Sequence, residues 1–157
     1  MDDRQLETFV AHMREFLGIC RSELGLTFIP KIRWVIDRGG VENRTFGQYV
    51  PTNSVIDISI RDRHPLDIMR TLAHELVHYQ QHTEGQLKPS SGQTGSREEN
   101  EANSIAGVIM RHFNRKFPDA FTMHPLNEDN RRVRAIEPKT FDNIYNIQNY
   151  DRLTPKR

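Results

Sequence analysis

Apolar and polar residues follow two periods along this chain, and these periods predict the order of its first elements. From Leu6 to Leu17 apolar residues recur every three or four positions, which predicts an amphipathic helix over residues 2–24 that ends at Gly25. Residues 31–36 and 55–60 alternate with period two, as strands do, and residues 45–50 read as a further strand. The segment 51–54 predicts a hairpin turn between the last two strands.

A second helix is predicted after these strands. Pro65 suits a first helical position, and apolar residues keep the three- and four-residue spacing as far as Thr83, with Gly85 as the stop. A loop rich in Gly, Ser and Pro follows over residues 85–96. These features predict a helix of about five turns that starts at Pro65.

A third helix begins where this loop ends. Ser96 followed by Glu99 reads as a capping box, and the helix is expected to run to about residue 117, where Pro118 stops it. Its small residues Ala102 and Ala106 would permit close approach to the preceding helix. The elements together predict an α+β domain over residues 1–117, in which helices pack on a small mixed β-sheet. Residues 118–157 are expected to wrap this domain or to be partly disordered.

The second predicted helix carries His74, Glu75 and His78 in the order HELVH. Two histidines four apart on a helix present two imidazoles on one face, one turn apart, and this arrangement is typical of a zinc site. Glu75 stands where such sites keep a carboxylate that accepts the proton of a water molecule. With seven histidines in 157 residues, chance alone sometimes produces this order on a surface helix. The residues around HELVH therefore have to show whether this order marks a metal site.

A third metal ligand is expected because a catalytic zinc usually has about three protein ligands and one open position. Glu98, Glu99 and Glu101 stand in the first turns of the third helix. Glu99 is expected to serve the cap, whereas Glu98 and Glu101 lie three apart on a shared face and could both face the metal. All three carboxylates could instead complement the positive end of the helix dipole.

HELVH and the later segment ENEANSIAG together resemble the gluzincin group of zinc metallopeptidases, particularly its small bacterial and phage members. The upstream segment TFGQYVPTNSVIDISI resembles the edge strand of the zincin fold, and the resemblance covers roughly residues 31–117. It implies a zincin-like fold with an active-site helix and a ligand-bearing helix. It also implies one Zn²⁺ per chain held by His74, His78 and Glu101, with Glu75 as the catalytic base of peptide hydrolysis.

The chain departs from this group at one position. Several larger gluzincins have an Asp four residues after the ligand Glu, and it orients a ligand histidine; Ile105 occupies that position here. The partners of the histidines therefore stay open among Asn103, Glu98 and a backbone carbonyl. The metzincin pattern is absent because Gln81 replaces its Gly, and His82 is expected to be a solvated helix residue.

Charge and composition limit the partners. Lys and Arg total 22 against 21 Asp and Glu, which gives no strong case for binding to nucleic acid or to an anionic membrane. The N-terminus lacks the basic start and apolar centre of a signal peptide, so a cytoplasmic location is expected. Cys20 is the only cysteine, which excludes an intramolecular disulfide and fits a reducing compartment.

The expected substrate is a protein or peptide with narrow specificity, held in extended form along residues 45–60. Trp34 and Tyr49 could line a specificity pocket, although an aromatic side chain in a strand is more often a core residue. Hydrolysis of a peptide bond benefits from a hydrogen-bond donor to the oxyanion that develops on the carbonyl oxygen. The candidates for this donor are His112, His124, Tyr145 and Tyr150. The alternative function is a zinc-stabilised, non-catalytic binding or assembly protein on the same scaffold.

Overall fold

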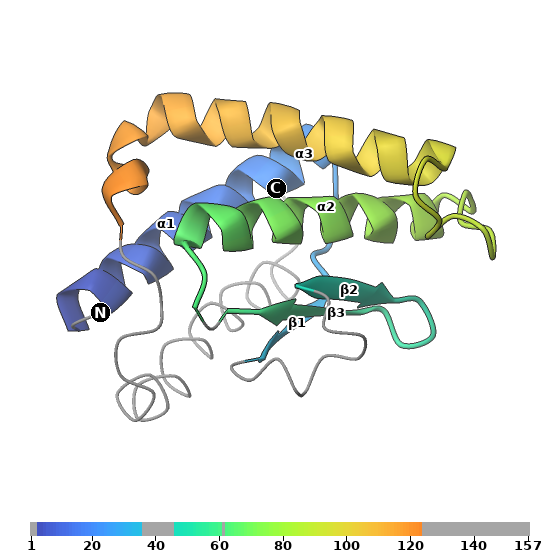
Figure 1. The fold of residues 1–157 in the computed structure, drawn as a ribbon, viewed down its shortest axis with the longest axis horizontal. Coiled ribbons are helices and arrows are strands. Elements are labelled where there is room, and N and C mark those ends of the chain that lie inside the picture. The colour runs from blue at the N-terminus through green and yellow to red at the C-terminus, as the bar shows by residue number, and fades with distance from the viewer. Residues whose placement is uncertain (1–2, 36–45, 61, 124–157) are drawn as a thin grey trace.

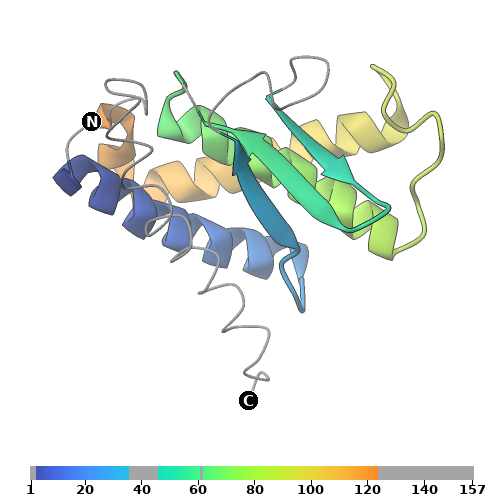
Figure 2. The same cartoon turned by 90° about the horizontal axis from the view of Figure 1, so that it is seen from below.

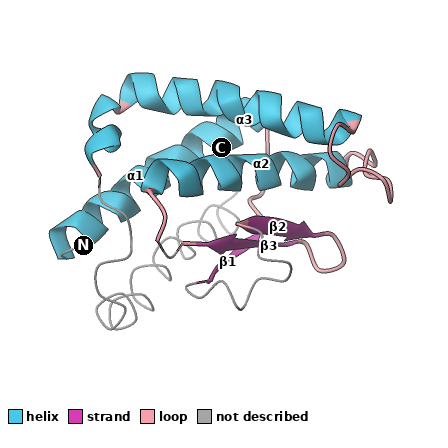
Figure 3. Cartoon of the chain, viewed as in Figure 1, coloured by secondary structure: helices cyan, strands magenta, loops and turns pink. Residues whose placement is uncertain are grey.

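The chain forms three strands and three α-helices in the computed structural model, which describes residues 3–35, 46–60 and 62–123. The elements follow in the order α1 (Asp3–Leu24), β1 (Lys31–Val35), β2 (Gly47–Val50), β3 (Val55–Ser59), α2 (Pro65–Thr83) and α3 (Arg97–Lys116). A short 3-10 helix, η3 (Pro118–Thr122), follows α3 directly. Figure 3 shows this division between helices and strands. The predicted α+β class is confirmed.

The sheet is mixed, with the strand order β1-β3-β2. β1 runs parallel to β3, with Lys31 opposite Val55, and β2 runs antiparallel to β3, with Val50 opposite Val55. The turn between β2 and β3 occupies residues 51–54, as predicted. β2 is consequently an edge strand among the strands that the structure describes.

All three α-helices lie on one side of the sheet (Figure 1). The view from below shows the sheet in front and the helices behind it (Figure 2). α2 lies against β2 and β3, and α3 packs along α2, while α1 contacts both helices. A continuous apolar core joins these layers; its fully buried side chains include Phe9, Phe16, Ile56, Ile58, Leu72, Leu76, Ile109 and Phe113. The core therefore fixes α2 between the sheet and α3.

The helices begin and end at the residues that the sequence indicates. Pro65 opens α2, and the N–H of Glu99 donates to the hydroxyl of Ser96 (3.1 Å) at the start of α3. Gly25 and Gly85 follow α1 and α2 with φ of 62° and 72°, a conformation that glycine adopts without the steric penalty of a Cβ. These ends agree with the predicted ones to within a residue or two.

Arg63 fixes the approach of the chain to α2. Its side chain is 2% exposed and donates to the carbonyl of Ser59 (2.7 Å), the carboxylate of Asp67 (2.9 Å) and the carbonyl of Phe46 (3.2 Å). The guanidinium thus ties the end of β3, the segment before β2 and the first turn of α2 together. Burying this cation is tolerable because its N–H groups find acceptors.

The predicted boundary at residue 117 is followed by residues that pack on the domain. Ala120 of η3 is fully buried, and η3 contacts both α2 and α3. The rest of the predicted C-terminal extension, from residue 124 onward, lies outside the described residues.

Candidate metal centre

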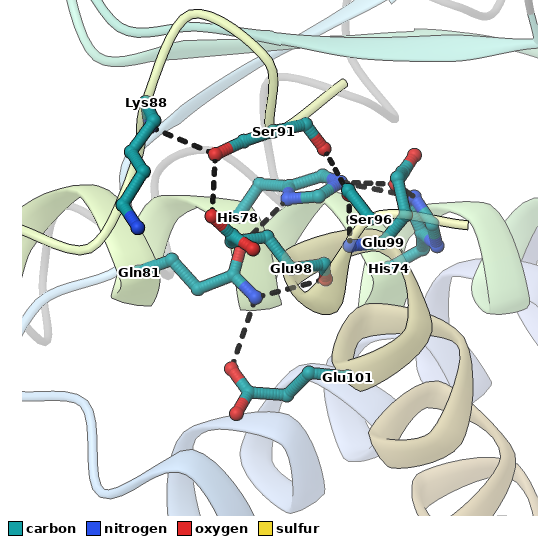
Figure 4. A network of polar contacts seen from close by, with 9 residues as sticks. All are labelled: His74, His78, Gln81, Lys88, Ser91, Ser96, Glu98, Glu99 and Glu101. Atoms are coloured by element: carbon teal, nitrogen blue, oxygen red, sulfur yellow. Dashed lines mark hydrogen bonds and ion pairs between the residues drawn. The ribbon is translucent and has the colours of Figure 1, made fainter. Parts of the chain in front are cut away.

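Two histidines of α2 form the first half of the site. His74 and His78 are one turn apart, their Nε2 atoms are 3.1 Å from each other, and both rings face α3 (Figure 4). Their side chains are 20% and 12% exposed, so they are partly shielded from solvent. Burial lowers the pKa of His74, and the nearby His78 ring acts in the same direction. The unprotonated imidazole that a metal requires is therefore favoured at His74.

Glu99 of α3 completes the group. Its Oε2 atom is 3.2 Å from the Nε2 of His74 and 2.9 Å from the Nε2 of His78. Among the described residues, these three are the group of histidine, cysteine and acidic side chains close enough to share an ion. The structure thus brings the two predicted histidines together with a carboxylate from the predicted helix.

The carboxylate differs from the expected one. Glu101 does not reach the histidines; its Oε1 accepts a hydrogen bond from the Nε2 of Gln81 (2.9 Å) (Figure 4). Glu99 was expected to serve the helix cap, but the cap uses only its backbone N–H. The side chain of Glu99 is therefore free to face α2, and the expectation for Glu101 does not match the geometry.

The spacing of the apolar residues of α3 could have indicated that Glu101 does not face the two histidines. The face of α3 that packs inward carries Ala102, Ala106 and Phe113, all at most 2% exposed. Glu99 lies seven residues before Ala106 and fourteen before Phe113, so it shares this face, whereas Glu101 is rotated away from it.

The three donor atoms fit a tetrahedral zinc ion. An ion about 2.1 Å from each donor in tetrahedral geometry would separate the donors by roughly 3.4 Å. The observed separations are 2.9, 3.1 and 3.2 Å, only slightly shorter. Two imidazole nitrogens and one carboxylate oxygen are also the donor types that zinc accepts, and three of them leave a fourth position open. The residues present therefore fit the expected metal.

Glu75 lies beside this group in a buried position. The residue is 8% exposed, and burial raises the pKa of its carboxyl to about 7. The negative charge of Glu99 acts in the same direction, while the His78 ring and a hydrogen bond from the backbone N–H of Tyr49 oppose the shift. A carboxyl with a pKa near neutrality can both accept and release a proton, which is the property of a general base and acid.

A cavity of about 400 Å³ opens next to these residues. It is bounded by α2, by the β2–β3 hairpin and by the loop between α2 and α3. Its lining includes Glu75, His78, Tyr49, His82, Leu87 and Pro89. The site is therefore accessible to a ligand that has an apolar part.

Tyr49 and His82 both line this cavity. For Tyr49 this is the pocket alternative, whereas His82 was expected in solvent. The Tyr49 hydroxyl lies 2.5 Å from the Nδ1 of His82, and both side chains are partly buried. Burial raises the pKa of the Tyr49 hydroxyl, which keeps its proton. No local pattern indicated this pair, because the contact joins β2 to the last turn of α2.

Of the four predicted oxyanion donors, His112 belongs to the described residues, and it contacts α1 instead of the site. The Nδ1 of His112 is 2.8 Å from Glu23 of α1, in an exposed position. His124, Tyr145 and Tyr150 lie outside the described residues. Trp34 packs against the core, as expected for an aromatic residue of a strand.

Comparison with known proteins adds no relative. No protein-family model matches the chain, and the curated proteins and the solved structures give no match either. Among the described residues, no helix is both long enough and apolar enough to cross a membrane.

Proposed function

We propose that this protein is a zinc-dependent peptidase with a zincin-like fold, which hydrolyses peptide bonds in a narrow protein or peptide substrate. The observation that carries the proposal is the convergence of His74, His78 and Glu99 next to the buried Glu75, at the edge of a cavity. A site that only stabilises the fold does not require a buried carboxyl at the position of Glu75. We propose a cytoplasmic location as well.

His74, His78 and Glu99 would hold the ion. When bound, zinc would supply Lewis-acid chemistry, because it lowers the pKa of water from 15.7 toward about 7 and polarises a carbonyl group. The ligands come from α2 and α3, which pack along each other, so the rigid contact between these helices fixes the distances among the donors. Little rearrangement would be needed on binding.

Glu75 would move the proton. Its carboxylate accepts a proton from water as the water oxygen bonds to the carbonyl carbon, and it then returns this proton to the amide nitrogen as the C–N bond breaks. The products are one carboxylate and one amine. The hydrogen bond from the Tyr49 N–H holds the Glu75 side chain at the cavity wall during both transfers.

The substrate would lie between the hairpin and the loop after α2. β2 is an edge strand of the described sheet, and its Tyr49 lines the cavity together with Leu87 and Pro89. An extended peptide can therefore lie along β2 while one of its apolar side chains enters the cavity. Our candidate donor to a developing oxyanion is the Tyr49 hydroxyl, which lines this wall, retains its proton and would exchange its contact with His82 for one with the substrate.

The test is hydrolysis of a mixed peptide library by wild type and by Glu75→Gln, with zinc content measured on the same samples. Wild type should cleave, and Glu75→Gln should retain zinc but lose cleavage. Glu7→Gln makes the same chemical change on the exposed surface of α1 and should behave as wild type. Equal cleavage by Glu75→Gln and wild type would refute the role of Glu75. Zinc binding without cleavage by wild type would favour the alternative, a zinc-stabilised binding or assembly protein.

A further inference from the structure

Gln81 is a buried polar residue that touches the site without belonging to the metal ligands. It lies on α2 three residues after His78, and the residue is 1% exposed. Its amide makes three hydrogen bonds in the described structure: with the Nδ1 of His78 (2.8 Å), with the backbone carbonyl of Glu98 (3.0 Å) and with the carboxylate of Glu101 (2.9 Å). Figure 4 shows Gln81 between His78 and Glu101.

The chemistry of these partners fixes the orientation of the amide. A backbone carbonyl and an ionised carboxylate only accept hydrogen bonds, so the NH₂ group of Gln81 must face Glu98 and Glu101. The Oε1 atom is then left for His78. Because an amide oxygen only accepts, the Nδ1 of His78 must carry a proton.

This assignment determines the tautomer of His78. A neutral imidazole with its proton on Nδ1 has its lone pair on Nε2, the atom that lies 3.1 Å from His74 and 2.9 Å from the Glu99 carboxylate; an ion bound there would take the place of any proton that Nε2 shares with Glu99. The opposite tautomer would place a hydrogen where the ion has to bind. The direction of the Gln81 amide therefore decides whether His78 can act as a ligand.

We propose that Gln81 is a positioning residue that holds His78 in its metal-binding tautomer, and that Glu101 acts through Gln81 by holding the amide in this direction. The proposal rests on the metal centre described above. It also gives Glu101, the carboxylate expected as a ligand, a different role. Glu101 accepts a hydrogen bond from Gln81, and Gln81 in turn contacts the ligand His78. A neutral amide occupies the place that is usually taken by a carboxylate, a carbonyl or water.

The first test compares zinc affinity in wild type and Gln81→Met, a substitution that keeps the length of the side chain and removes the acceptor. Loss of an outer partner of a metal-bound histidine typically weakens binding by about 10- to 100-fold, and this range is expected here. Circular dichroism and thermal unfolding of both proteins check that the fold is retained. Zinc binding by a folded Gln81→Met within about twofold of wild type would overturn the proposal.

The second test exchanges the two polar groups. In the double variant Gln81→Glu with Glu101→Gln, one carboxylate oxygen at position 81 again faces His78, and the amide at position 101 donates to the other oxygen. This second oxygen also meets the backbone carbonyl of Glu98, where the wild-type amide donates, so the double variant should recover only part of the affinity that Gln81→Met loses. A purely space-filling role of Gln81 would produce no such recovery. Affinity of the double variant as low as that of Gln81→Met would count against the proposal.

The third test needs no variant and no metal. Long-range ¹H–¹⁵N correlation spectra of the histidine rings of metal-free wild type at pH 8 report which ring nitrogen of His78 carries the proton. The proposal requires a proton on Nδ1, whether or not Nε2 also shares one with Glu99, and a ring that carries its proton on Nε2 alone would overturn it even if the protein binds zinc. Conversely, failure of wild type to bind zinc would reject the proposed function, while the position of this proton would still decide what Gln81 does.

Discussion

Glu75 is expected to destabilise the metal-free fold at neutral pH, and replacing it by Gln should reveal this. The carboxyl of Glu75 is buried, and its pKa rises to about 7 from an ordinary value of 4.5. The folded protein must therefore either keep a proton that the unfolded chain would release or hold a buried charge. Gln at this position has the same shape and can accept the hydrogen bond from the Tyr49 N–H, but it carries no charge.

The sign and size of the effect follow from the two pKa values. Because the folded pKa lies above the unfolded one, the penalty is absent below pH 4.5, grows as the pH rises and becomes constant above about 7. The difference between the two pKa values corresponds to roughly 3 kcal/mol at the plateau. The second N–H of the Gln amide needs a partner, which reduces the gain, so Glu75→Gln should stabilise the metal-free protein by about 1–3 kcal/mol at pH 8.

The assay is urea unfolding of wild type and Glu75→Gln between pH 5 and 8, after dialysis against a chelator. The stability difference should be below about 1 kcal/mol at pH 5 and should level off above pH 7. Glu7→Gln serves as the control for the same chemical change on the surface and should show no such trend. A difference that does not change with pH, or a Glu75→Gln protein that is less stable at pH 8, would refute the reasoning.

Three further substitutions test other parts of the structure. Asp57→Asn should cost about 1.5–3 kcal/mol at pH 7, because the carboxylate accepts two hydrogen bonds from Arg33 (2.5 and 2.7 Å). Since the hydrogen bonds from Arg33 lower the pKa of Asp57, the wild-type advantage in denaturant unfolding should decrease as the pH falls below the ordinary value of 3.8 and disappear through the lowered one; an advantage that is the same at pH 3 as at pH 7 would contradict this. Arg63→Met removes the side-chain donor to the buried carbonyl of Ser59 and should lower stability by about 1–3 kcal/mol in urea unfolding, whereas a loss below about 0.5 kcal/mol would contradict the anchoring role. Tyr49→Phe should lower kcat at least about tenfold with zinc binding retained, whereas unchanged kcat would exclude the Tyr49 hydroxyl as the oxyanion donor.

Much of the fold was predictable because its determinants are local. Proline at the start of α2, the serine cap of α3 and the glycines after α1 and α2 act within a few residues of where they stand, so the sequence indicates the helix ends directly. The alternation of Val55–Ser59 indicates a strand in the same way. The pairing of His74 with His78 is equally local, because it follows from the period of one helix.

The third member of the site depends on how α3 is turned against α2. Glu98, Glu99 and Glu101 are close in sequence and similar in chemistry, and the packing of Ala102 and Ala106 decides which of them faces the histidines. Sequence reasoning from the cap alone could not supply this rotation.

The contacts of Tyr49 with His82 and of Gln81 with His78 were missed for two different reasons. The first joins residues 33 positions apart, so it depends on the packing of β2 against α2. The second lies within one helix, but the orientation of the Gln81 amide follows only from its contacts with α3. There the NH₂ group of Gln81 donates to oxygens of Glu98 and Glu101, which leaves the amide oxygen for His78.

The metal content of purified wild type, Glu99→Ala and Glu101→Ala, with zinc affinity measured by competition with a chelator, tests the central claim most directly. Wild type should hold about one zinc per chain, in keeping with the one group of donors found among the described residues. Glu99→Ala should lose more affinity than the roughly 10- to 100-fold expected for an outer partner, and Glu101→Ala should lose no more than that range. Wild-type affinity in Glu99→Ala together with loss of zinc in Glu101→Ala would contradict the ligand assignment, and absence of zinc from wild type would contradict the metal centre itself.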